Sequence, residues 1–135
     1  MSARHVEGPD AVQQRALRQA ARAELGRRAE VMACKHLETQ GFEILARNVR
    51  VGRLELDVIA RRGRMVVFCE VRSRRSDRLM TPAQSIDGAK VTRVRQAAGR
   101  WLRENGQSYR EIRFDVASVV FDTPEGRLNY LQGAF

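Results

Sequence analysis

Two stretches of sequence decide the fold, Gly52-Arg53-Leu54-Glu55-Leu56-Asp57-Val58-Ile59-Ala60 and Met65-Val66-Val67-Phe68-Cys69-Glu70-Val71-Arg72. The first alternates, which predicts a strand with its leucines and Val58 on one face and its two acids on the other. The second is apolar and rich in β-branched residues, as is typical of a buried strand. Gly63 lies between them and allows the positive φ of a tight turn, so the two stretches predict a β-hairpin.

The register of this hairpin brings carboxylates together. With Arg62-Gly63 at the centre of the turn, Asp57 is expected to face Phe68. Asp57 and Glu70 then become diagonal neighbours on one face, roughly 7 Å apart at the backbone, and Arg72 points to the same face. Two carboxylates at that separation can converge on one hard divalent cation, which prefers oxygen ligands.

The alternative interpretation is an exposed strand face that carries ordinary solvated charges. The sequence around Glu70 argues against it, because apolar residues flank this acid on both sides. A carboxylate buried in such a strand is costly unless a cation or hydrogen bonds compensate its charge. The hairpin therefore favours a metal site, and phosphodiester cleavage is a frequent use of such a site.

The length of 135 residues predicts one domain over residues 11–135, preceded by a flexible tail over residues 1–10. No apolar run approaches the roughly 20 residues that a membrane span needs, and residues 1–8 lack the apolar stretch of a signal peptide. We therefore expect a cytoplasmic protein. Cys34 and Cys69 lie in apolar surroundings and are expected to be buried, reduced thiols rather than a disulfide.

The charge of the chain points to a polyanionic partner. There are 25 basic and 16 acidic residues, which give a formal net charge of +9, and only Lys35 and Lys90 are lysines. A small domain this basic usually meets nucleic acid or an anionic membrane surface. The basic stretch Ala11–Arg28 has few bulky apolar residues, which disfavours a membrane-binding helix. Nucleic acid, with DNA foremost, is the expected partner.

The remaining sequence predicts helices around a mixed sheet. Helical composition runs from Ala11 to Gln40, with Asp10 as the N-cap and Gly41 as the C-terminal glycine, while Gly26 predicts two helices or a bend. A further helix is predicted over residues 87–103. Strands over residues 42–49, 112–121 and 127–131 would join the hairpin. This order indicates an α/β fold with a central mixed β-sheet of about five strands flanked by helices.

Several blocks of sequence form an ordered set from about Gly26 to the C-terminus. They are Gly26-Arg27-Arg28-Ala29-Glu30, Leu37-Glu38-Thr39-Gln40-Gly41-Phe42, Ala46-Arg47-Asn48, the hairpin stretches quoted above, Lys90 and Arg113-Phe114-Asp115-Val116. Together they resemble the YraN-like family of small bacterial proteins. That family is similar to archaeal Holliday-junction resolvases within the PD-(D/E)xK nuclease superfamily, so the resemblance implies a restriction-endonuclease-like fold.

The resemblance also implies roles for five side chains. Asp57 matches the first metal-binding acid of the superfamily, Glu70 the second, and Glu30 the helical acid that some members add, with Mg²⁺ or Mn²⁺ as the implied cofactor. Arg72 stands where the superfamily has a lysine; arginine can neutralise a phosphate, but its pKa above ~12 excludes a role as general base. Lys90 matches members whose catalytic lysine has moved to a neighbouring helix, and the alternative is an ordinary surface lysine.

These observations predict a metal-dependent endonuclease or nuclease-like DNA-binding protein that acts on the phosphodiester backbone, with branched DNA as a candidate substrate. The alternative is a catalytically inactive nucleic-acid-binding or scaffold protein of the same fold, in which Arg72 has ended turnover. A symmetric homodimer would suit a junction, because a junction presents two related strands. Seven arginines are expected to contact the nucleic-acid backbone, Arg50, Arg53, Arg74, Arg75, Arg78, Arg93 and Arg95.

Overall fold

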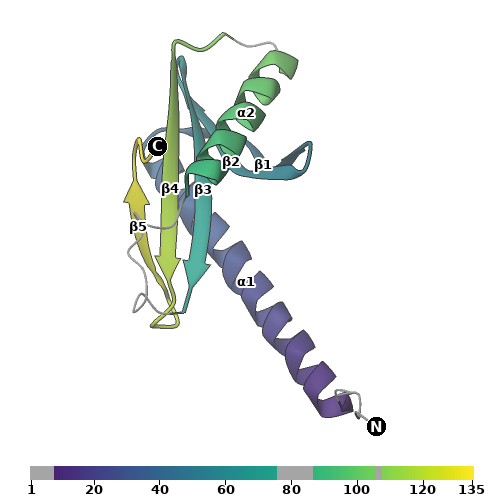
Figure 1. Ribbon diagram of the computed structural model, residues 1–135. Helices are drawn as coiled ribbons and strands as arrows, with labels where there is room; N and C mark the ends of the chain where they lie inside the picture. Colours follow the sequence, from purple (N-terminus) through teal and green to yellow (C-terminus); the bar gives the residue numbers. More distant parts are fainter. Residues whose placement is uncertain (1–7, 76–86, 106–107) are drawn as a thin grey trace.

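The computed structural model describes residues 8–75, 87–105 and 108–135, and in these ranges a five-stranded sheet lies between two helices (Figure 1). The elements follow the predicted order. They are α1 (Pro9–Thr39), β1 (Glu43–Val51), β2 (Leu54–Arg62), β3 (Met65–Arg74), α2 (Gly88–Glu104), β4 (Glu111–Val120) and β5 (Arg127–Leu131).

The sheet is mixed, as the sequence predicts. Its strands lie in the order β1-β2-β3-β4-β5, and every neighbouring pair is antiparallel except β3 and β4. These two run parallel because α2 carries the chain from the end of β3 back to the start of β4. The α/β fold with about five strands is therefore confirmed.

The two helices cover opposite faces of the sheet, and β3 supplies both cores. Val67 and Cys69 pack in the cluster that contains Leu37 of α1, whereas Val66 and Phe68 pack in the cluster that contains Val94 of α2. Successive residues of a strand point to opposite faces. A strand buried on both faces must be apolar along its whole length, which explains the unbroken run Met65-Val66-Val67-Phe68-Cys69.

Helix α1 is a single helix, so the predicted alternative of two helices separated at Gly26 is wrong. One glycine inside a helix costs about 1 kcal/mol relative to alanine, and the strong helix formers around it outweigh that cost. The helix also begins earlier than expected, at Pro9, with Gly8 as the N-cap and no side-chain cap. Asp10 therefore lies in the first turn, where its negative charge suits the helix dipole, and is not the cap.

The C-terminal end of α1 is set by Gly41, as predicted. Gly41 has φ +86°, and its N–H donates to the carbonyl of Glu38. The N–H of Phe42 donates to the carbonyl of Leu37. This pair of bonds is the Schellman arrangement, and the contact of Phe42 with Leu37 in one core cluster accompanies it. The chain is thereby turned from the helix directly into β1.

The register of the β2–β3 hairpin differs from the predicted one. Arg62 pairs with Met65, and Phe68 faces Ile59 rather than Asp57. The turn is therefore Gly63-Arg64, with Gly63 at φ +61° in its first central position, as in a type II′ turn. Continuing this register places Asp57 opposite Glu70, so the predicted diagonal relationship is wrong and the two acids are closer neighbours.

The predicted common face of the leucines and Val58 in β2 is also wrong. Leu56 packs in the cluster under α2, whereas Val58 packs in the cluster under α1. The cause lies on the neighbouring strand, where Asn48 adopts φ +52° between two residues that pair with Leu56 and Val58. This left-handed residue interrupts the regular alternation at Asp57.

The first half of α1 extends beyond the sheet (Figure 1). Every residue from Gly8 to Ala20 is exposed, and the first fully buried residue of the helix is Ala29. No helix in the described ranges is both long enough and apolar enough to cross a membrane.

Candidate metal centre and nucleic-acid interface

The candidate site lies where β2 and β3 separate. Their pairing ends at Val58 and Cys69, although β2 stays paired with β1 and β3 stays paired with β4 beyond this point. Asp57 and Glu70 are the first residues past the last pair. The backbone N–H of Val71 donates to Asp57 Oδ2 at 2.8 Å, which fixes this carboxylate at the start of the opening.

Three carboxylates converge at this opening. One oxygen each from Glu30, Glu55 and Asp57 lies within 4.8 Å of the other two. Glu30 comes from α1 and also accepts hydrogen bonds from Asn48 at 3.1 Å and Arg47 at 3.4 Å. The predicted neighbours Glu30 and Asp57 are therefore brought together. Glu55 was not predicted as a ligand, although its alternation with Asp57 in the sequence was a signal for it.

Glu70 lies on the α2 side of Asp57, outside this group of three. Its side chain is almost fully buried, and its Oε2 lies 3.6 Å from the ammonium nitrogen of Lys90. Burial and then the negative charge of Asp57 raise the pKa of Glu70 to about 8, although Lys90 acts in the opposite direction. Burial also raises the pKa of Asp57, against the hydrogen bond from Val71. Without a cation, both carboxylates are thus held in an environment that disfavours their charge.

Lys90 is positioned for this contact by the start of α2. Asp87 caps the helix, because its side chain accepts a hydrogen bond at 2.8 Å from the backbone N–H of Lys90. The cap fixes the first turn, and the side chain of Lys90 reaches Glu70 from there. The structure thus places the one lysine of α2 beside Glu70.

Arg72 is half-buried on β3, two residues beyond Glu70. Burial, followed by the positive charge of Arg74, lowers the pKa of Arg72. Its Nε is enclosed and has no hydrogen-bond partner among the described residues. A buried donor without a partner costs free energy, so this guanidinium is suited to an anionic ligand that supplies the missing acceptor.

The acidic group meets the oxygen-ligand requirement of a hard divalent cation. Oxygens bound to one Mg²⁺ at 2.0–2.1 Å lie at most about 4.2 Å apart. The separations among Glu30, Glu55 and Asp57, all within 4.8 Å, therefore need to close by less than about 1 Å. Side-chain rotation alone can supply such a movement.

Two of the predicted backbone-contacting arginines share a groove between the β1–β2 turn and α2. Arg53, in the β1–β2 turn, and Arg93, on α2, line a groove of about 250 Å³ together with Arg100. The sequence prediction missed Arg100, which follows Arg93 by two helical turns and whose guanidinium lies over Gly52. The spacing of these two arginines on one helix was the available signal.

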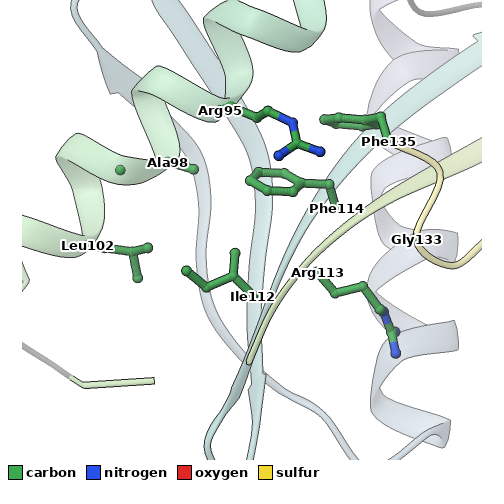
Figure 2. A pocket seen from close by; sticks show the side chains of 9 residues that line it. Arg95, Ala98, Leu102, Ile112, Arg113, Phe114, Gly133 and Phe135 are labelled. Atoms are coloured by element: carbon green, nitrogen blue, oxygen red, sulfur yellow. The ribbon is translucent and has the colours of Figure 1, made fainter. Parts of the chain in front are cut away.

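The other predicted arginines lie elsewhere. Arg95 faces the opposite side of α2, where its guanidinium lies 5.0 Å from the ring of Phe114 in a pocket of about 410 Å³ that contains none of the acids (Figure 2). Arg75 lines another cavity beside Phe121, Arg74 ends β3, and Arg50 is exposed on β1. Arg78 lies outside the described residues. The six described arginines thus do not form a single surface.

Comparison with known proteins gives one consistent family. Residues 29–119 match the family model described as Uncharacterised protein family UPF0102, which is the YraN family. A UPF0102 protein of Acidothermus cellulolyticus is 39% identical over 126 residues, covering 85% of this chain and 96% of the relative. One from Sorangium cellulosum is 44% identical over 119 residues, covering 85% and 83%. One from Frankia alni is 42% identical over 113 residues, covering 82% and 93%.

Proposed function

This chain belongs to the uncharacterised protein family UPF0102, and from the geometry of its acidic group we propose that it is a metal-dependent phosphodiesterase that cleaves nucleic acid, with DNA as the expected substrate. The observation that carries the proposal is the convergence of Glu30, Glu55 and Asp57 on one point, with the buried Glu70 and Lys90 directly beside it. A basic groove between the β1–β2 turn and α2 would offer a path for phosphates.

The carboxylates of Glu30, Glu55 and Asp57 would hold Mg²⁺ or Mn²⁺, and Glu70 would add a fourth oxygen donor after a rotation of its side chain. A bound ion of this kind polarises a scissile phosphate and lowers the pKa of a bound water. The Val71 N–H keeps Asp57 oriented toward the opening. Because three elements contribute the acids, the site is assembled only in the folded chain.

The two cations beside the acids have different tasks in this proposal. Lys90 offsets the charge of Glu70 and would donate hydrogen bonds to the attacking water or to a phosphate oxygen. Arg72 keeps its charge at every working pH, so it would neutralise the phosphate during the reaction without transferring a proton. The tasks of the superfamily's single lysine would thus be shared by Lys90 on α2 and Arg72 on β3.

A cleavage panel tests the proposal. Duplex, single-stranded, flap and four-way-junction DNA would each be incubated with Mg²⁺, with Mn²⁺ and with EDTA, using wild type and the Asp57→Asn variant. We expect cleavage of at least one substrate by the wild type with metal, and none by the variant or with EDTA. Absence of cleavage from every substrate would overturn the proposed activity.

One observation favours a second function, a non-catalytic nucleic-acid-binding protein of the same fold. Arg72 occupies the position of the superfamily lysine and cannot act as a base. In this alternative the basic groove binds phosphates while the acidic group serves only the structure. Calorimetry with Mn²⁺ separates the two functions, because the enzyme must bind the ion through Asp57 and the alternative protein need not bind it.

A further inference from the structure

The projecting part of α1, Pro9–Arg22, is called the arm below. With a rise of 1.5 Å per residue, the whole helix is about 46 Å long, and the arm is about half of it. The matched family region begins only at residue 29, so the arm lies outside it. An isolated helix of this length is marginal in water, and the packed second half must maintain it.

Three arginines of the arm form one stripe. Arg15, Arg18 and Arg22 follow at intervals of three and four residues and are all exposed. At 100° per residue these side chains fall within an arc of about 60°. Ala29, seven residues after Arg22, falls in the same arc and is fully buried against the sheet. The stripe is therefore apolar where α1 overlies the sheet and basic where α1 extends beyond it.

The arm carries more positive than negative charge. The arm holds three arginines and one acid, Asp10, and the next acid along α1, Glu24, pairs with Arg27 at 2.7 Å. Arg28 is also engaged, because it donates to the carbonyl of Pro124 and lies over the ring of Phe121. No ion pair holds Arg18 or Arg22 within the described part of the chain. The stripe thus presents positive charge on one side of α1. In the second half of the helix, the same side packs against the sheet.

We propose that the arm binds the phosphate backbone of a nucleic-acid duplex through Arg15, Arg18 and Arg22. Arg15 and Arg22 are about 10.5 Å apart along the helix, and one strand of a duplex presents a phosphate every 3.4 Å of its axis. The stripe therefore matches about three consecutive phosphates. Such contacts position a duplex without reading its sequence.

The arm also has a defined place relative to the acidic group. Glu30 follows Arg22 by eight residues and Arg15 by fifteen, which is about 12 Å and 22 Å along the axis of α1. At 3.4 Å per base pair, the arm would hold the duplex about four to seven base pairs from the scissile phosphate. The inference rests on the proposed function in taking nucleic acid as the ligand, and this spacing also takes the scissile phosphate to lie at the acidic group.

The composition of the arm disfavours other occupants. Val12 and Leu17 are the only bulky apolar residues between Pro9 and Ala20, and they point about 140° apart around the helix. A second copy or a membrane would need an apolar stripe, which these two residues do not form. Two arms of this charge would also repel each other. A polyanion is the partner that matches the surface.

The test compares wild type with the Arg15→Gln/Arg18→Gln/Arg22→Gln variant and with a control, Arg64→Gln/Arg103→Gln/Arg110→Gln. The control removes the same charge from exposed positions outside the arm. Binding to a 24-base-pair duplex would be followed by fluorescence anisotropy in EDTA at several salt concentrations. We expect the arm variant to lose at least about 10-fold in affinity, with the slope of log K against log salt reduced by up to about 2.7, and the control to keep the wild-type slope.

Several outcomes would overturn the inference. They are equal slopes for the arm variant and the control, no duplex binding by wild type, a change from dimer to monomer in sedimentation caused by the arm substitutions, and loss of binding to anionic phosphatidylserine vesicles with duplex binding unchanged. Because the measurement is made without metal, it is independent of cleavage. A wild type that binds through the arm but never cleaves would leave the inference standing and remove the proposed activity.

Discussion

The ammonium nitrogen of Lys90 lies 3.6 Å from Glu70 Oε2, where the start of α2 meets the point at which β2 and β3 separate. This contact joins a capped helix to a buried strand, and it places the lysine next to the buried acid of the site. If the pair has a chemical task, replacing Lys90 should affect cleavage far more than it affects folding.

Lys90→Ala should lower the rate of cleavage by about 10²–10⁴-fold, because the variant loses a positioned proton donor and cation. Lys35→Ala is the matched control, since Lys35 is the other lysine of the chain and is exposed on α1. The rates would be measured on whichever DNA substrate the wild type cuts. Equal rates for the two variants would show that Lys90 is only a surface lysine.

Glu55→Gln should weaken Mn²⁺ binding by at least about tenfold, and Asp57→Asn should abolish it, because each removes a charged oxygen ligand. Isothermal titration calorimetry measures both effects. Glu111→Gln, an exposed acid at the start of β4, is the control and should bind as wild type does. If Glu55→Gln binds normally while Glu70→Gln does not, the ion lies between Asp57 and Glu70 instead.

The metal-free protein should lose stability as the pH rises. Burial raises the pKa of Glu70 from 4.5 to about 8, so between these values the folded chain binds more protons than the unfolded chain. The stabilisation is complete below pH 4.5 and is lost by about pH 8, with an expected fall in unfolding free energy of about 2–4 kcal/mol. Urea unfolding in EDTA at several pH values measures it.

Glu70→Gln is the control for this pH effect, because an amide does not titrate and should flatten the profile over the same range. Mg²⁺ added at pH 8 should restore stability to the wild type by binding the ionised carboxylates of the folded state. A wild-type profile as flat as that of the variant would mean that Glu70 ionises normally.

Arg72→Gln should reduce cleavage by about 10²-fold, since a fixed positive charge beside the phosphate is lost, whereas Arg72→Lys should retain most of the activity. Neither substitution should lower the thermal midpoint much, because the enclosed Nε of Arg72 has no partner among the described residues to lose. Single-turnover rates and melting curves would be recorded together. Inactivity of the lysine variant would indicate that the geometry of the guanidinium matters.

Asp115 is predicted to be a structural residue. It is fully buried and accepts hydrogen bonds from Arg113, from the Tyr130 hydroxyl and from the Gly133 N–H. Asp115→Asn should cost about 3–5 kcal/mol, because it leaves the Arg113 charge without its partner. The exposed pair of Asp122 with Arg127 offers the control, and Asp122→Asn should leave the urea midpoint nearly unchanged.

The sequence predicts the elements well because most of them carry a strong periodic pattern. The apolar run from Met65 to Cys69 needs two covered faces, and it lies in the centre of the sheet. Helix α1 ends at Gly41 because this residue adopts a positive φ, which suits glycine. Gly26 misled the prediction, because the cost of one glycine is small beside the packing of α1 on the sheet.

The register of the hairpin could not be settled from its hydrophobic pattern. Gly63 fits either central position of a two-residue turn, and the choice changes each pairing by two residues. A change of one residue would turn every side chain to the other face, but a change of two leaves the faces as they were. The pattern therefore could not show how directly Asp57 and Glu70 oppose each other.

The convergence of Glu30 and Glu55 depends on contacts that no local pattern encodes. Asn48, on β1, adopts a left-handed conformation and donates to Glu30, which belongs to α1. This residue disturbs the alternation of β2 at Asp57, so the face of each acid there depends on a neighbouring strand. The family resemblance predicted Glu30 as a metal ligand, whereas Glu55 was identified as a candidate ligand only in the folded structure.

The hydrogen bond from the Val71 amide to Asp57 makes one backbone group a spectroscopic reporter for the site. Its proton chemical shift depends on the charge and position of the carboxylate oxygen that accepts it. Protonation of Asp57, or capture of that carboxylate by an ion, should therefore move a single resonance in a nitrogen–proton correlation spectrum. The state of the acids becomes visible in solution without a substrate and without any turnover.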